Sequence, residues 1–187
     1  MNKTAKIIFV IIVVVVITFL GYTFGVKKNN IFPPAPKLPT TITFQETGGG
    51  CGNIVVYKIN STDTAGISVS ASKGKLNLST TDKTFEVGKT DGLEVKIHVG
   101  KKIRQLYCND VLHPHPDQPE PKKLIAKSGQ AIISISKVDE SQPVWNRNYT
   151  ATVTLKDIHF TEENGNDSDI TIGELIFKDI AVGWLPG

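Results

Sequence analysis

The sequence has little of what marks helical domains or the common catalytic motifs. After residue 40, no window shows an apolar stripe with a 3.6-residue period and a cap, so no helical domain is indicated. No Gly-x-Ser-x-Gly elbow is present, and the glycine cluster at 48–52 lacks the Lys-Ser/Thr of a phosphate loop. We interpret those glycines as a tight turn or bulge. A secreted hydrolase with its residues on separate loops stays open as an alternative.

The sequence also lacks a basic stripe. The net charge of +3 arises from five lysines that all precede residue 40. From residue 40 onward the chain has 16 basic and 18 acidic residues, which is a net charge of −2. A nucleic-acid-binding domain shows a basic face or stripe. We therefore expect no nucleic acid among the partners of this chain.

One long apolar run is present, at residues 7–24, where 18 residues contain no charge. At about 1.5 Å per residue, a helix of this length just spans a hydrocarbon core of about 30 Å. The run predicts a single-pass signal anchor within residues 1–26, with the lipid bilayer as partner and the C-terminal domain outside the cytoplasm. The alternative is a signal peptide, cleaved after about residue 25, which would leave a secreted protein.

A proline-rich linker is predicted at residues 27–39. Four of the seven residues from Pro33 to Pro39 are proline. Such a segment is extended and semi-rigid, and it cannot complete a helix or a strand ladder. We interpret it as a spacer between the membrane and a domain at residues 40–187.

The domain at 40–187 has the pattern of an all-β protein. In Leu93–Val99, apolar and polar residues alternate over the whole run. The same alternation in 148–156 slips by one residue, which predicts a bulge or a change of sheet near Lys156-Asp157. Nine to ten short strands with frequent turns indicate an antiparallel β-sandwich, with a barrel as the alternative.

Other strand boundaries follow from the same alternation. We expect a first strand at 40–46, and further strands at 75–80 and 103–109. Segments 124–126 and 130–138 are predicted to form a hairpin across Lys127-Ser128-Gly129.

The chain has two cysteines, Cys51 and Cys108. Outside the cytoplasm, two cysteines are typical of one disulfide. The bridge would close a loop of about 58 residues and would stabilise the fold by about 4 kcal/mol in the chain-entropy model. Free buried thiols and metal ligands are the alternatives.

A candidate metal site lies in a proline-rich loop. His113, His115 and Asp117 are two residues apart, so in an extended chain they project to the same side. Two imidazoles and a carboxylate suit zinc or copper. Three ligands on one loop need a fourth group and supporting contacts, so a solvated Pro/His loop is the simpler interpretation.

Two tryptophans are candidate binding residues, Trp145 and Trp184. An exposed tryptophan on a β domain stacks on sugar rings or anchors a partner, although it more often plugs the end of a core. The sequence as a whole favours a non-enzymatic binding or structural module of the envelope, with an envelope protein or glycan as its partner. An extracytoplasmic metal-binding protein is the main alternative.

Overall fold

The computed structural model of the chain describes residues 42–109, 119–143 and 146–184. The chain divides into two compact units, Met1–Lys37 and Leu38–Gly187, and the described residues all belong to the second. Within the described ranges, no helix has the length and apolar character needed to cross a bilayer. The predicted anchor at 7–24 and the linker at 27–39 lie outside these ranges.

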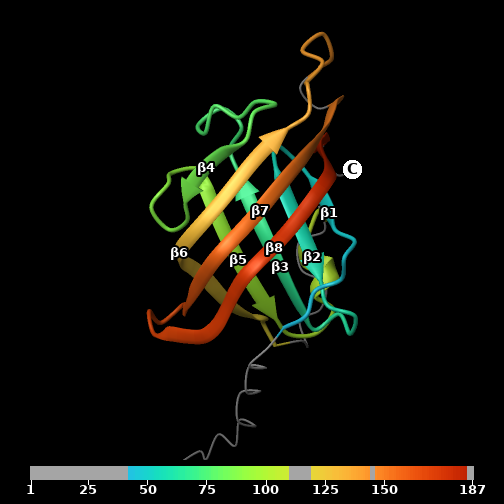
Figure 1. Ribbon diagram of the computed structural model, residues 1–187. Coiled ribbons are helices and arrows are strands. Elements are labelled where there is room, and N and C mark those ends of the chain that lie inside the picture. The colour runs from blue at the N-terminus through green and yellow to red at the C-terminus, as the bar shows by residue number, and fades with distance from the viewer. Residues whose placement is uncertain (1–41, 110–118, 144–145, 185–187) are drawn as a thin grey trace, which may run out of the picture. The chain divides into compact units, whose positions relative to one another are not determined.

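Eight strands and one short 3₁₀ helix make up the described fold (Figure 1). In chain order they are β1 (Gly49–Cys51), β2 (Val55–Ile59), β3 (Ala65–Ala71), β4 (Lys83–Glu86), β5 (Leu93–Val99), η1 (Ile103–Leu106), β6 (Lys122–Ile135), β7 (Asn146–Glu162) and β8 (Asp167–Trp184).

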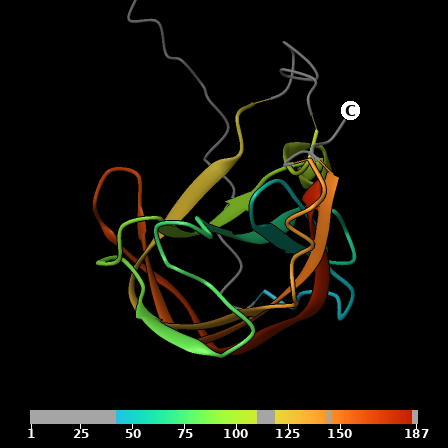
Figure 2. The same cartoon turned by 90° about the horizontal axis from the view of Figure 1, so that it is seen from above.

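All eight strands belong to one antiparallel sheet, in the order β1-β2-β3-β5-β6-β7-β8, and β4 pairs with β6. Seen from above, the sheet curls around its own interior as a half-barrel (Figure 2). The all-β antiparallel prediction is confirmed. The predicted β-sandwich of nine to ten strands is not observed, since the eight described strands form one curled sheet. The three long strands β6, β7 and β8 bend at bulges, so one continuous sheet wraps around the core.

Two of the bulges lie where the backbone takes positive φ values. Asp157 has φ 51°, and the pairing of β6 with β7 shifts beside it, which confirms the bulge predicted near Lys156-Asp157. Asp179 has φ 50° beside a shift in the pairing of β7 with β8. The predicted hairpin across 127–129 is wrong, since β6 runs through these residues with a register shift on each side of Ser128.

Three other predicted strands are also wrong. The first is the strand predicted at 40–46, since residues 42–48 are not in a strand. Strand β1 lies instead within the glycine cluster, and a turn follows it at Gly52. The second is the strand predicted at 75–80, where residues 73–77 form a turn instead. Leu76 and Leu78 are both buried, and this spacing of two residues is the same as that of one face of a strand. The segment 103–109 contains η1, whose single fully buried residue is Ile103.

Two apolar clusters pack on opposite faces of the sheet. The inner core fills the curl and includes Phe160 and Phe177, which are fully buried. The outer cluster is smaller and consists of Ile59, Ile103 and Tyr107 with Tyr57 packed against them. Tyr57 and Ile59 alternate along β2 with residues of the inner face, so η1 and the segment after it cover the outside of the sheet.

Candidate functional site

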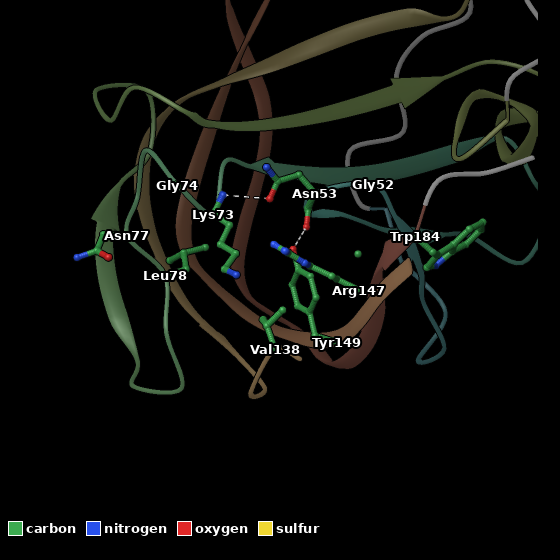
Figure 3. A pocket seen from close by; sticks show the side chains of 11 residues that line it. Gly52, Asn53, Lys73, Gly74, Asn77, Leu78, Val138, Arg147, Tyr149 and Trp184 are labelled. Carbon is green, nitrogen blue, oxygen red and sulfur yellow. Dashed lines mark hydrogen bonds between the residues drawn. The ribbon is translucent and has the colours of Figure 1, made fainter. Parts of the chain in front are cut away.

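A pocket of about 550 Å³ lies at one end of the curled sheet (Figure 3). Turns and strand ends that are far apart in the sequence meet there: the β1–β2 turn, the turn after β3, the loop after β6, the start of β7 and the end of β8. Its lining residues are Gly52, Asn53, Lys73, Gly74, Asn77, Leu78, Val138, Arg147, Tyr149, Gly183 and Trp184.

Asn53 connects three parts of the pocket wall. The Tyr149 hydroxyl donates a hydrogen bond to the backbone carbonyl oxygen of Asn53. The backbone N–H of Lys73 donates to Asn53 Oδ1 at 3.3 Å. The start of β7 and the turn after β3 are therefore both tied to the β1–β2 turn, and Figure 3 shows both bonds.

The β1 and β8 ends of the sheet meet beside the pocket. The Gly52 N–H donates to the carbonyl oxygen of Trp184, and the Gly183 N–H donates to that of Gly52, each at 2.7 Å. Gly183 has φ 86°, and a Cβ there would lie 2.0 Å from the carbonyl oxygen of Arg147. Only glycine fits this position, because a side chain would collide with backbone.

A carboxylate between two cations forms the polar side of the pocket. Lys73 Nζ lies 2.9 Å from Glu140 Oε1, and an Arg147 terminal nitrogen lies 2.6 Å from Glu140 Oε2. The side chains of Lys73 and Arg147 are each 28% exposed, whereas that of Glu140 is 62% exposed. The two cations therefore line the pocket while their carboxylate partner faces solvent. We call these three residues the Glu140 clamp.

Backbone contacts hold Arg147 in place independently of the Glu140 carboxylate. Its Nε donates to the carbonyl oxygen of Gln142 at 2.8 Å, and its second terminal nitrogen donates to that of Glu140 at 3.2 Å. Asp139, in the same loop, accepts hydrogen bonds from the N–H and hydroxyl of Ser141. The guanidinium is thus held by backbone carbonyl groups of the loop 139–142 in addition to the Glu140 carboxylate.

The pKa values of Glu140 and of the neighbouring Tyr149 are shifted in this site. The hydrogen bond from Lys73 and the charges of Arg147 and Lys73 hold the pKa of Glu140 below its ordinary value. Burial, assisted by the charge of Glu140, raises the pKa of Tyr149. Lys73 Nζ also lies 5.7 Å from the centre of the Tyr149 ring, within the range of a cation–π contact. At neutral pH the site therefore presents a carboxylate, two cations and a neutral phenol.

The chemistry of the pocket suits binding. Leu78 and Val138 supply apolar surface, and Tyr149 and Trp184 supply aromatic rings. Lys73 and Arg147 supply N–H donors and positive charge. A concave, mostly apolar site with a few convergent polar groups is typical of a small-molecule or chain-end site, and its volume falls within the usual range of about 300–1,000 Å³.

The residues predicted from the sequence fall into two groups. Trp184 lines the pocket. Trp145 and the predicted metal ligands His113, His115 and Asp117 lie outside the described residues, so the zinc or copper site stays a prediction. Within the ranges that the structure describes, no group of three or more His, Cys, Asp or Glu residues is placed to hold a metal ion.

The predicted disulfide between Cys51 and Cys108 is confirmed, with 5.7 Å between the Cα atoms. Cys51 ends β1 and directly precedes Gly52 and Asn53 of the pocket. Cys108 directly follows Tyr107 of the outer cluster. The bridge therefore attaches the segment that covers the outer face to the strand that begins the pocket wall.

A second polar group lies within the outer cluster. His98 Nδ1 and the Tyr107 hydroxyl are 3.1 Å apart and share a hydrogen bond, and the Tyr107 ring stacks on Tyr57 with 4.8 Å between centres. Burial raises the pKa of Tyr107, and a hydrogen bond with the Ser68 side chain opposes that shift. Burial, with the charges of the nearby lysines, lowers the pKa of His98. This group lies against packed side chains, away from the pocket.

Sequence reasoning missed Lys73, Arg147, Tyr149 and Glu140 as site residues. Tyr149 was predicted only as one apolar position of an alternating strand. Lys73 and Glu140 are 67 residues apart, and each stands in an ordinary polar turn. The only sequence signal for a site here is that polar turns lie at the ends of several predicted strands. Which of these turns come together depends on the curl of the sheet, and the strand pattern does not give that curl. Comparison with protein-family models, with curated proteins and with solved structures found no match for this chain.

Proposed function

We propose that this chain is a non-enzymatic binding module of the cell envelope. Residues 7–24 hold it at a membrane, residues 27–39 space it from the bilayer, and the β domain presents its pocket outside the cytoplasm. The partner is a small ligand, or the end of an envelope glycan or protein, that enters the pocket. The observation that carries this proposal is the pocket itself, in which aromatic rings, apolar side chains and two cations converge.

Two features of the fold support binding at this end of the sheet. The pocket is lined by turns and strand ends, the parts of a β scaffold that most often carry binding residues. Backbone hydrogen bonds at Gly52 and Gly183, and the bond from the Tyr149 hydroxyl to the carbonyl oxygen of Asn53, hold those turns against one another. A preorganised site loses less entropy when it takes up a ligand.

The binding experiment uses the full-length chain in lipid nanodiscs and envelope material from the source cell. Gly74 lines the pocket, and a Cβ there would meet no atom within 4 Å, so a side chain can start at this position and we expect Gly74→Phe to narrow the pocket. Gly173→Phe is the matched control, since Gly173 has equally open space on β8, away from the pocket. We expect Gly74→Phe to lose envelope binding and Gly173→Phe to keep it. Equal binding by both variants and the wild type would overturn the proposal.

The anchoring part is tested separately by extracting membranes of the producing cell at high pH. A retained anchor leaves the full-length chain with the membranes, as measured by intact mass. A chain that starts near residue 26 and is recovered from the medium would contradict anchoring and would make the protein secreted.

A further inference from the structure

The Glu140 clamp indicates which ligand group the pocket takes. Glu140 is the exposed member of the clamp, and its two cations line the pocket. Resting on the function proposed above, we propose that the ligand is a carboxylate-bearing glycan, whose carboxylate replaces that of Glu140 between Lys73 and Arg147. Glu140 is then a built-in substitute for the ligand and sets the specificity of the site.

The geometry makes the replacement inexpensive. Exposed ion pairs add little to stability, so the Glu140 carboxylate can leave its partners at small cost. Arg147 keeps its position, because its bonds to the carbonyl oxygens of Gln142 and Glu140 do not involve the carboxylate. An arriving carboxylate therefore meets a guanidinium that is already oriented, and charge-assisted hydrogen bonds to such a group are among the strong ones.

The remaining lining residues favour a sugar as the carrier of the carboxylate. Trp184 supplies a half-buried ring with one apolar and one polar part, the combination used where a ligand is apolar on one face and wet on the other. Tyr149 is only 7% exposed, and its ring lies under Lys73 at the base of the pocket. In Figure 3, Lys73, Arg147 and Tyr149 are grouped near the centre of the view, and Trp184 lies toward one end. In the proposed complex the acidic ring lies at the clamp, and a neighbouring ring of the glycan extends toward Trp184.

The test compares three probes by calorimetry with the full-length chain in nanodiscs. The first is a tetrasaccharide of alternating glucuronate and N-acetylglucosamine. The second is the same tetrasaccharide with its carboxyl groups reduced to primary alcohols. The third is an acidic tetrapeptide of alternating glutamate and glycine, with both ends blocked.

Glu140→Gln removes the built-in carboxylate, and Glu86→Gln is its control. Glu86, the last residue of β4, forms an exposed ion pair with Lys89, so this variant makes the same change in charge elsewhere. We expect Glu140→Gln to bind the acidic tetrasaccharide about three- to tenfold more tightly, the scale of releasing two exposed ion pairs. Glu86→Gln should leave the affinity unchanged, and neither variant should alter affinity for the reduced sugar.

A double variant separates direct competition from a general field effect. In a Lys73→Gln background one of the contested cations is absent, so the gain from Glu140→Gln should shrink markedly. If Glu140→Gln raises the affinity for the acidic sugar as much in this background as in the wild type, the ligand and Glu140 do not compete for Lys73. Unchanged or weaker acidic-sugar binding by Glu140→Gln would overturn the role of Glu140, and tighter binding of the peptide than of the sugar would overturn the glycan assignment.

Failure of this inference is distinguishable from failure of the proposed function. If envelope binding depends on Gly74 and yet the chain prefers the reduced sugar or binds no probe, the pocket function stands and the acidic-glycan inference is wrong. If envelope binding does not depend on Gly74, the proposed function itself is wrong.

Discussion

The inner core and the outer cluster are stabilised in different ways. The inner core gathers fully buried side chains from strands on both sides of the curl, and Phe160 and Phe177 are among the largest of them. The outer cluster has three buried residues, Ile59, Ile103 and Tyr107. We infer that apolar burial is the main interaction that stabilises the curled sheet. The outer covering buries fewer side chains, and the disulfide and specific hydrogen bonds add to its stability.

The pocket shares residues with the inner core and adjoins the disulfide that leads to the outer covering. Tyr149 and Leu78 belong to the inner core and also line the pocket. Gly52 and Asn53 line it too, and they directly follow Cys51, which is bonded to the outer covering. Changes in the core, in the covering and in the clamp should therefore affect the molecule to different degrees.

The largest effect is expected from the inner core. Phe160→Ala removes a fully buried ring and leaves a cavity, which costs about 3–5 kcal/mol of unfolding free energy. Urea denaturation measures this loss. Ile176→Ala is the control, because Ile176 is 46% exposed and its truncation should change stability by less than about 0.5 kcal/mol. Similar losses for the two variants would contradict a core that packs inside the curl.

Removing the disulfide should have the next largest effect, with an added local component near the bridge. A Cys51→Ala/Cys108→Ala variant should lose about 2–4 kcal/mol, because the bridge closes a long loop in the unfolded chain. Amide hydrogen exchange should rise throughout the fold by the amount of the global loss, and it should rise further in η1 and around Tyr107, where the covering can open locally. Equal loss of protection in both regions would show that the covering and the core unfold as one unit.

The comparison also shows what the sequence could predict. Leu93–Val99 was correctly predicted as a strand, because one of its faces packs on the core and the other does not. The bulge at Asp157 was predictable from the sequence. Because the same face of the strand stays buried on both sides of an inserted residue, the apolar alternation changes phase at the insertion. The pairing of Cys51 with Cys108 needed only an even cysteine count and an oxidising setting.

The errors came from patterns that two structures share. Apolar alternation interrupted by Lys127–Gly129 is the same for a hairpin and for a strand with successive bulges, and only the pairing partners decide between them. Leu76 and Leu78 alternate in a turn that caps the core. The pocket was beyond prediction from sequence, since it depends on the curl that brings Lys73 to Glu140, 67 residues away.

Lowering the pH should have a smaller effect on stability, through His98 beside the outer cluster. Burial and the charges of Lys96 and Lys123 lower the pKa of His98, while Glu163 and Glu94 oppose that shift. Between the lowered pKa and about 6.5, the unfolded chain binds a proton that the folded protein does not. Stability should therefore fall as pH falls through this window and level off below it. The slope is at most about 1.4 kcal/mol per pH unit for one proton.

Urea denaturation at several pH values from 8 down to 5 measures this dependence. A His98→Gln variant should show a flatter profile. His159→Gln is the control, since His159 is exposed on β7 and should leave the slope as in the wild type. A profile that stays steep in His98→Gln would assign the acid sensitivity to another group.

The smallest effect on stability is expected from the Glu140 clamp, because its ion pairs are exposed. The pKa of Glu140 is lowered in the folded protein, so the stability that the clamp contributes is fully present above the ordinary value of 4.5 and is lost as pH falls through the lower value. Glu140→Gln lacks this contribution at every pH. The difference between wild type and variant should therefore be measurable at pH 7 in low salt and should shrink toward pH 3. A difference that persisted unchanged at pH 3 would mean that the glutamine disturbs the loop 139–142 itself. In that case the carboxylate would be part of the pocket wall, and a ligand could not replace it.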